Sequence, residues 1–295
     1  MGWETNTGQQ GFQPSQEFLV VCDSDGTVLD SMDLKHRECF IPRFVQVFGL
    51  QPISRWAREA WEYQNLRSPQ RGVHRFVGLS NAIRMLAEHP KVQEAEIHLW
   101  NTDALDGWIA TTGRLSRGAL LEAVEQGQEE LALLWEWSQA VDRMVEELSG
   151  EFWMFPYVAE SLERLGETAD LVLYSDTPRE WLEREWQGSE LGGGFRLLLG
   201  EEEGTKRELV RWLVEQGGYA PRHVLVIGDS LVDYRAAKSA MALFFPILPG
   251  QEEASWYAFW TEGLERFLED RFAGEFEEEW LAKFRSALEQ YPAPW

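Results

Sequence analysis

Apolar residues along the chain follow two patterns, and each predicts a different kind of element. Short runs of large and β-branched apolar residues, bounded by polar residues or glycine, predict buried strands. Such runs occur at 18–22, 171–174, 195–199, 224–227 and 242–245. Helical patterns separate the later runs, as in the stretch after Pro156 and in 205–215. Alternating strands and helices predict an α/β fold in which helices cover a parallel sheet.

The segment between the first and second predicted strands differs from the rest. Across 31–155 no comparable strand run occurs, and apolar residues recur at helical spacing instead. Leu134 and Val141, for example, lie on one helical face. A segment of this length can form a domain. We therefore expect an inserted all-helical domain here, between two parts of an α/β core at 1–30 and 156–250.

Amphipathic helices are also predicted from about residue 250 onward. One apolar stripe runs from Trp256 to Leu268, and another runs from Phe276 to Leu288. An apolar stripe usually marks a buried helix face. We expect 251–295 to form a helical extension packed on the core, and docking on a partner is the alternative.

The composition is strongly acidic, with 27 Lys and Arg against 50 Asp and Glu and a net charge of −23. A field of this sign repels nucleic-acid phosphates and anionic lipid, so we expect neither a nucleic acid nor a membrane as partner. An anionic substrate would need a local positive site, such as a metal ion and a lysine. Few lysines are available for this role, namely Lys35, Lys91, Lys206, Lys238 and Lys283.

The sequence also favours a cytoplasmic location. No apolar run approaches the length of a membrane span. Residues 1–16 are polar and contain no basic side chain, unlike a secretory signal. Cys22 and Cys39 are too few for a disulfide framework.

Candidate chemistry begins where the first predicted strand ends, at Asp23, Ser24, Asp25, Gly26 and Thr27. In open α/β sheets ligands bind outside the carboxyl ends of the strands. Gly26 permits the backbone reversal that such a site needs. One carboxylate could then attack a substrate while the other transfers protons. A capped turn is the structural alternative, because Asp and Gly are common in turns.

A second pair of acids, Asp229 and Asp233, follows the run 224–227. If a helix begins near Ser230, both acids can face the same crevice. Asp229 with Asp23 would form an oxygen-rich pocket suited to Mg²⁺. Helix capping by Asp229 or Ser230 is the alternative.

The run 171–174 ends in Ser175 and Asp176. A hydroxyl group and free backbone amides at this point suit a phosphate oxygen. Taken alone, the segment is also typical of an ordinary helix start.

Together these segments resemble the haloacid dehalogenase-like hydrolase superfamily, whose four motifs occur here in order. Motif I matches 23–28, motif II matches Ser175, motif III matches Lys206 and motif IV matches 228–233. The combination is far more specific than any single motif. The resemblance implies a Rossmann-like core. The helical insertion resembles the C1 cap of this family in type only, and the residues after about 250 match nothing in it.

The resemblance also implies roles for the reacting residues. Asp23 would be the nucleophile that forms an aspartyl-phosphate, and its carboxylate would bind Mg²⁺. Asp25 would protonate the leaving oxygen and then deprotonate the hydrolytic water, while its backbone carbonyl binds the metal. Lys206 would balance the negative charge of nucleophile and phosphate. Asp229 would complete the metal site, and Asp233, outside the direct ligands, would orient Lys206 or a metal-bound water.

Substrate contacts follow from the same resemblance and from one loop of the insertion. Thr27 and Ser175 would hold phosphoryl oxygens, with Asp176 beside them. In the insertion, the polar loop at 65–72 is the best candidate for recognising the leaving group of the substrate. Its candidate residues are Asn65, Arg67 and Arg71. Arg67 or Arg71 could contact a second anionic group, although solvated surface arginines are the commoner case.

Asp25 narrows the reaction class. Dehalogenase-type and phosphonatase-type relatives lack an aspartate at this position, so its presence favours cleavage of a phosphomonoester of a small phosphorylated metabolite. A sugar phosphomutase is one alternative, since it shares both aspartates and the cap class. A non-catalytic binding protein is another. The sequence predicts neither the substrate nor the oligomeric state.

Overall fold

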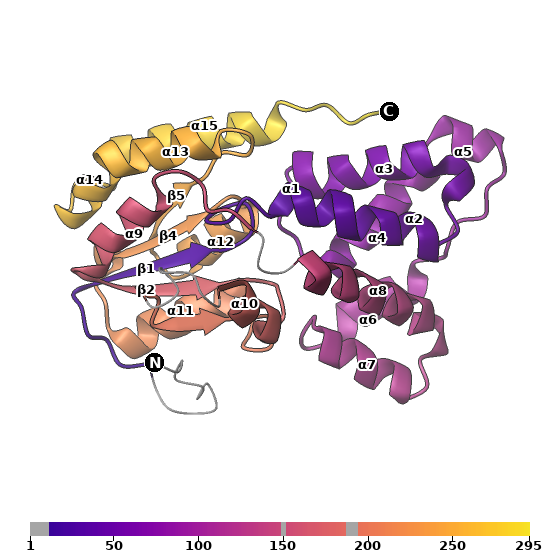
Figure 1. Cartoon of the computed structure of the whole chain (residues 1–295), viewed down its shortest axis with the longest axis horizontal. Coiled ribbons are helices and arrows are strands. Elements are labelled where there is room, and N and C mark those ends of the chain that lie inside the picture. The colour runs from indigo at the N-terminus through magenta and orange to yellow at the C-terminus, as the bar shows by residue number, and fades with distance from the viewer. Residues whose placement is uncertain (1–11, 149–151, 187–193) are drawn as a thin grey trace. The chain divides into compact units, whose positions relative to one another are not determined.

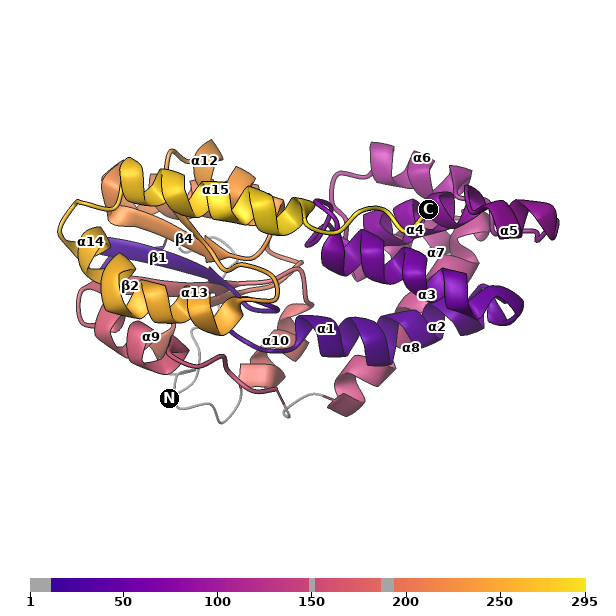
Figure 2. The same cartoon turned by 90° about the horizontal axis from the view of Figure 1, so that it is seen from above.

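The computed structural model describes residues 12–148, 152–186 and 194–295. The chain divides into two compact units (Figures 1 and 2). The first, here called the α/β unit, contains Met1–Ser31 and Gly150–Leu288. The second, here called the helical unit, contains Met32–Ser149 and Glu289–Trp295.

Five parallel strands form the sheet of the α/β unit, in the order β3-β2-β1-β4-β5. The strands are β1 (Phe18–Asp23), β2 (Ala169–Tyr174), β3 (Leu197–Leu199), β4 (Val224–Gly228) and β5 (Leu243–Pro246). Every residue of β1, β2, β4 and β5 is buried. Strands covered on both faces require continuous apolar runs, which explains the pattern in the sequence. The predicted α/β fold is confirmed.

Helices connect the strands and cover the sheet. They are α9 (Val158–Gly166), α10 (Arg179–Trp186), α11 (Lys206–Gly217) and α12 (Leu231–Ser239). α9 packs on β2, and α11 packs against α12. β1 and β4 are neighbours although about 200 residues separate them, so their carboxyl ends and the loops that follow lie side by side.

The chain continues from β5 into α13 (Glu252–Ala258), a π-helical turn (Phe259–Gly263), α14 (Leu264–Leu268) and α15 (Glu275–Glu289). Phe245 of β5 contacts Phe259 and Trp280 of this extension, with ring centroids 5.0 and 4.7 Å apart. Glu277 of α15 accepts a hydrogen bond from the backbone N–H of Phe244 at 2.9 Å. The extension therefore covers the edge strand and pairs a backbone N–H group on its outer edge.

The last seven residues differ from this pattern, because Glu289–Trp295 pack on the helical unit. Trp295 donates its indole N–H to the carbonyl of Met85 at 3.2 Å and lies edge-on against His89. The expectation that all of 251–295 packs on the core is therefore wrong for this tail. Pro292 and Pro294 cannot continue α15 as a helix, so the chain leaves the α/β unit in an extended form.

Helices alone make up the described part of the inserted segment. They are α1 (Met32–Leu34), α2 (Ile41–Val47), α3 (Ser54–Glu62), α4 (Arg75–Ala87), α5 (Pro90–Glu94), α6 (Asp103–Thr111), α7 (Arg117–Glu125) and α8 (Ala132–Leu148), with short 3₁₀ and π-helical turns between some of them. Trp61 lies at the centre of its core, with ring centroids 5.0 Å from Phe44 and 5.8 Å from Trp137. Aromatic packing therefore holds this unit together.

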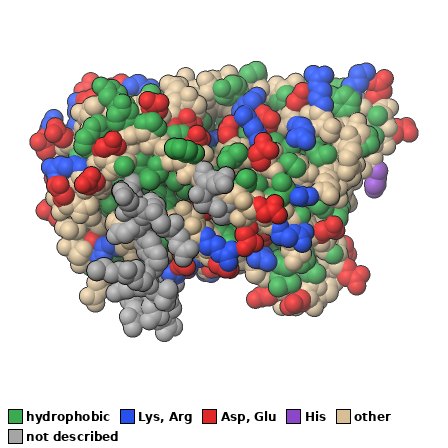
Figure 3. Space-filling model, viewed as in Figure 1, with side chains coloured by type: hydrophobic (Ala, Val, Ile, Leu, Met, Phe, Trp, Pro, Cys, Tyr) green, Lys and Arg blue, Asp and Glu red, His purple; other side chains and the backbone are tan. Residues whose placement is uncertain are grey.

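In the described ranges, no helix has both the length and the apolarity that a membrane crossing requires. On the face shown in Figure 3, Asp and Glu side chains are interspersed with Lys and Arg.

Candidate active site

The loop after β1 places its residues through a compact backbone turn. The carbonyl of Ser24 accepts hydrogen bonds from the N–H groups of Thr27, Val28 and Leu29 at 2.9–3.3 Å. Gly26 has a φ of +76°, a conformation that other residues rarely adopt. Asp23 therefore stays at the buried strand end, while Asp25 lies half-buried in the turn.

Lys206 lies at the start of α11 and reaches the end of β1. Thr205 and Glu208 form a capping box that fixes where this helix begins. The Lys206 Nζ atom is 2.8 Å from Asp23 Oδ1 and 2.8 Å from Asp233 Oδ1. Burial alone would lower the pKa of Lys206, but Asp23 and Asp233 raise it well above its usual value. The two carboxylates therefore favour the charged form of Lys206 at this strand end.

Asp233 has its carboxylate oxygens occupied by protein donors. Its Oδ1 accepts hydrogen bonds from Lys206 Nζ at 2.8 Å and from the Tyr174 hydroxyl at 2.9 Å. Its Oδ2 accepts from the Ser230 backbone N–H at 3.1 Å and from the Ser230 hydroxyl at 2.6 Å. This carboxylate is suited to positioning its neighbours and has little capacity left to bind a metal ion directly.

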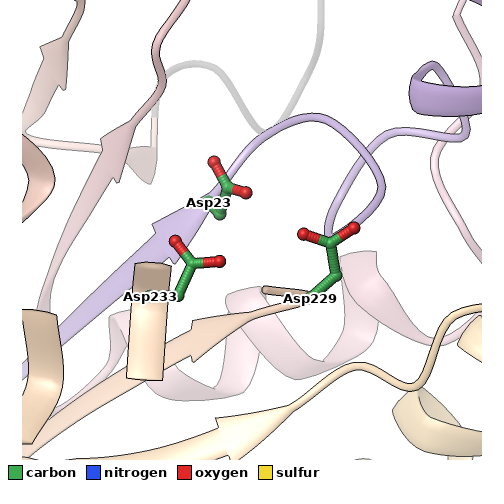
Figure 4. A group of neighbouring side chains, drawn as sticks. All are labelled: Asp23, Asp229 and Asp233. Atoms are coloured by element: carbon green, nitrogen blue, oxygen red, sulfur yellow. The ribbon is translucent and has the colours of Figure 1, made fainter. Parts of the chain in front are cut away.

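Asp23, Asp229 and Asp233 converge at the ends of β1 and β4 (Figure 4). Each offers a carboxylate oxygen within 4.8 Å of the others, and all three residues are buried. Burial raises the pKa of Asp23 well above its usual range; Asp233 and Asp229 act in the same direction, and Lys206 opposes them. Three buried carboxyl groups lie beside a single lysine, which cannot balance the negative charge of all three. Because hard cations prefer oxygen ligands, this donor set fits a divalent cation.

Asp25 is oriented by hydroxyl groups from two different loops. Ser31 donates to its Oδ1, and Thr177 donates to its Oδ2 at 3.3 Å. The Thr177 contact joins the loop after β1 to the loop after β2. An acid held in this way, near a second acid at the strand end, could serve in proton transfer.

Two hydroxyl groups near these acids could bind an anion. Ser175 is buried, and its Oγ accepts a hydrogen bond from the Thr177 N–H at 3.1 Å. Thr27 is fully buried, and within the described residues its Oγ1 has no hydrogen-bond partner. Leaving a buried hydroxyl unpaired costs free energy, so a ligand oxygen at this position would satisfy it. Asp176 is half-buried beside Ser175 and contributes to the raised pKa of Lys206.

The three candidates in the insertion make contacts inside the helical unit. Asn65 is buried and donates to the carbonyl of Trp61 at 3.1 Å. Arg71 is also buried and donates to the carbonyl of Leu66 at 3.1 Å. Their contact with a substrate stays a prediction.

Arg67 is the most exposed of these three candidates. Its Nη2 atom lies 3.0 Å from Glu62, and its guanidinium faces the Tyr291 ring at 5.5 Å. A substrate role for Arg67 also stays a prediction.

Sequence reasoning missed several residues that support the site. The apolar pattern predicts only a strand position for Tyr174, although a tyrosine directly before Ser175 is a polar signal in an apolar run. Ser31 and Thr177 orient Asp25, and neither belongs to the positions that carried the motifs. Trp256 donates its indole N–H to the carbonyl of Thr27 at 2.7 Å. Nothing in the sequence indicates this last contact.

Comparisons with known proteins find similarity among solved structures only. No family model matches the chain, and no curated protein matches it. A predicted phosphoglycolate phosphatase from Haemophilus somnus is 16% identical with a TM-score of 0.49, over 80% of this chain and 87% of that one. A HAD-superfamily hydrolase from Geobacter sulfurreducens is 17% identical with a TM-score of 0.40, over 79% and 88%.

A protein from Thermotoga maritima, provisionally assigned as a β-phosphoglucomutase, is also similar. It is 18% identical with a TM-score of 0.43, over 78% of this chain and 84% of that one. At these identities and TM-scores the function must be argued from the residues of the site.

Proposed function

We propose that the chain is an Mg²⁺-dependent phosphatase that hydrolyses a phosphomonoester of a small metabolite through an aspartyl-phosphate on Asp23. One observation carries this proposal. A buried lysine, Lys206, lies 2.8 Å from Asp23 at the carboxyl end of the central strand, in the same loop cluster as Asp25 and the buried hydroxyl of Thr27. A nucleophile, a proton-transfer group and anion-binding groups are thus present together.

In the first step a carboxylate oxygen of Asp23 attacks phosphorus. An oxygen–phosphorus bond forms as the bond to the leaving oxygen breaks, and Asp25 gives that oxygen its proton. Lys206 stabilises the ionised form of Asp23 and the negative charge of the transferring group. The hydroxyl groups of Thr27 and Ser175 hold phosphoryl oxygens during this step.

In the second step water attacks phosphorus of the aspartyl-phosphate. Asp25, now ionised, accepts a proton from this water, so phosphate leaves and the carboxylate of Asp23 is restored. The hydrogen bonds from Ser31 and Thr177 keep Asp25 in place for both steps. The acid and the base are therefore the same residue in its two protonation states.

The carboxylates of Asp23 and Asp229, with the backbone carbonyl of Asp25, would hold the Mg²⁺ ion. When bound, the ion supplies positive charge that neutralises the phosphoryl oxygens. Asp233 stays outside the direct ligands, because its oxygens already accept four hydrogen bonds. We propose that the helical unit recognises the leaving group, and Asn65, Arg67 and Arg71 are the candidate contact residues.

A panel of small phosphomonoesters, assayed with Mg²⁺ and with a chelator, tests this function. We expect phosphate release that depends on Mg²⁺ and a loss of about a thousandfold or more in Asp23→Asn. Asp30→Asn serves as a matched control, because Asp30 is an exposed acid close to the same loop. Full activity in Asp23→Asn would exclude attack by this carboxylate.

The same assays address the alternatives. A phosphomutase would convert sugar phosphates into isomers without releasing phosphate. A binding protein would turn over no phosphomonoester in the panel. The set of Asp23, Asp25, Ser175, Lys206 and Asp229 favours catalysis, because a scaffold has no need to keep all five.

A further inference from the structure

Tyr174 is the last residue of β2 and is completely buried. It is the parallel register partner of Asp23 in β1, so the two side chains emerge as neighbours on the same face of the sheet. Its hydroxyl donates to Asp233 Oδ1 at 2.9 Å. Its ring centre lies 4.8 Å from Lys206 Nζ, within the range of a cation–π contact. Tyr174 therefore meets Lys206 directly and also through a shared acceptor.

The shared acceptor makes the hydroxyl of Tyr174 important for the position of Lys206. Asp233 Oδ1 accepts from both Tyr174 and Lys206, while Asp233 Oδ2 is occupied by Ser230. If the Tyr174 hydroxyl were absent, Oδ1 would keep Lys206 as its only donor among these contacts. The buried carboxylate would then attract the ammonium group more strongly, at the expense of its contact with Asp23.

We infer that Tyr174 is a positioning residue that keeps the ammonium group of Lys206 on Asp23, by satisfying Asp233 with its hydroxyl and facing Lys206 with its ring. This role rests on the proposed function, in which Lys206 stabilises Asp23 and the transferring phosphoryl group. The observed contacts of Tyr174 are with Asp233 and Lys206. It acts through Lys206.

The other end of β2 offers a matched control. Tyr219 donates its hydroxyl to buried Asp170, which lies near the amino end of the strand. Tyr219→Phe removes the same kind of buried tyrosine–aspartate hydrogen bond from the same strand, but away from the site. A merely structural role predicts similar effects of Tyr174→Phe and Tyr219→Phe on activity.

Kinetics on the best phosphomonoester substrate separate these possibilities. We expect Tyr174→Phe and Tyr219→Phe to lower Tm similarly. Only Tyr174→Phe should lower kcat, by about tenfold, with KM changed by less than about threefold. Wild-type kcat in Tyr174→Phe, or an equal loss of kcat in Tyr219→Phe, would overturn the inference.

A second measurement does not depend on turnover. The chain has few lysines, so the ¹⁵N-labelled side-chain ammonium signal of Lys206 can be assigned by its loss in Lys206→Met. We expect the Tyr174 ring to shift this signal, Tyr174→Phe to retain much of the ring shift, and Tyr174→Leu to abolish it. Tyr219→Phe should leave the signal unchanged.

The two readouts distinguish failure of the inference from failure of the proposed function. If the wild-type protein hydrolyses no phosphomonoester but the Lys206 signal responds to Tyr174 as expected, the function is wrong and the positioning of Lys206 stands. If Tyr174→Phe and Tyr174→Leu both leave the signal unchanged, the positioning role is wrong whatever the activity.

Discussion

Trp256 donates its indole N–H to the backbone carbonyl of Thr27 at 2.7 Å, across 229 positions of sequence. The indole is fully buried and belongs to α13 in the C-terminal extension. The carbonyl belongs to the loop that carries Asp25 and the buried Thr27 hydroxyl. The extension therefore supports the loop after β1 as well as covering the edge strand.

We predict that Trp256→Phe loosens this loop. The phenylalanine ring keeps part of the packing, but the carbonyl of Thr27 loses its indole donor, and this costs about 1–3 kcal/mol of unfolding free energy. Denaturant unfolding measures the loss, and we also expect a several-fold decrease in kcat. Trp260→Phe is the control, because Trp260 lies in the same segment and is partly exposed. Equal stability of the two variants would contradict the prediction.

Gly228 permits the close approach of Asp233 to the end of β4. A Cβ atom at Gly228 would lie 2.4 Å from both Cβ and Cγ of Asp233. We expect Gly228→Ala to displace Asp233, to lower the unfolding free energy by about 1–3 kcal/mol and to reduce kcat through Lys206.

Gly107→Ala is the matched control for this substitution. Gly107 lies inside α6, where an added Cβ meets nothing within 4 Å. Alanine there should stabilise the protein by up to about 1 kcal/mol, since glycine is a poor helix former. Chemical denaturation and steady-state kinetics of both variants check the pair. Normal kcat in Gly228→Ala would exclude the steric argument.

Asp170 gives the stability of the α/β unit a specific dependence on pH. Its carboxylate accepts hydrogen bonds from Ser15, Gln16, Tyr219 and Arg196. Burial alone would raise the pKa of Asp170, but these hydrogen bonds outweigh it and lower the pKa. A lowered pKa in the folded state stabilises the protein above the ordinary aspartate pKa of about 3.9.

This stabilisation should be lost as the pH falls below about 4 towards the lowered pKa. We expect Asp170→Asn to cost about 2–4 kcal/mol at neutral pH, since a buried network loses its charge. The loss should shrink in acid. Thermal unfolding between pH 3 and pH 7 measures it, and a difference from wild type that did not change with pH would contradict the assignment.

The tail of the chain should stabilise part of the helical unit. Trp295 contacts His89, and His89 in turn stacks on Trp56 with ring centroids 4.6 Å apart. We predict that Trp295→Ala increases hydrogen exchange at the backbone amides of 289–295 and 85–89. Trp153→Ala should change neither region, because Trp153 is 82% exposed and lies in the α/β unit. Unchanged protection in Trp295→Ala would show that the tail contributes nothing there.

Much of the fold could be predicted because the relevant signals are local. Each of the five strands contains a short run of mainly apolar residues, since strands buried on both faces favour apolar side chains. The helical nature of the insertion was visible in its spacing. The position of Asp23 at a strand end followed from the same run, and its proximity to Asp229 followed from the rule that ligands bind where parallel strands end.

The sequence by itself determined which residues could react: two aspartates in a glycine turn, one lysine at a helix start and two more acids after a strand. Only the tertiary structure decided what supports them. Tyr174 reaches Asp233 across 59 positions, and Trp256 reaches Thr27 across 229. Neither periodicity nor local propensity predicts these two contacts, because each depends on how separate elements pack. The path of the C-terminal tail also depends on packing, because Trp295 contacts Met85, which lies 210 positions earlier in the sequence.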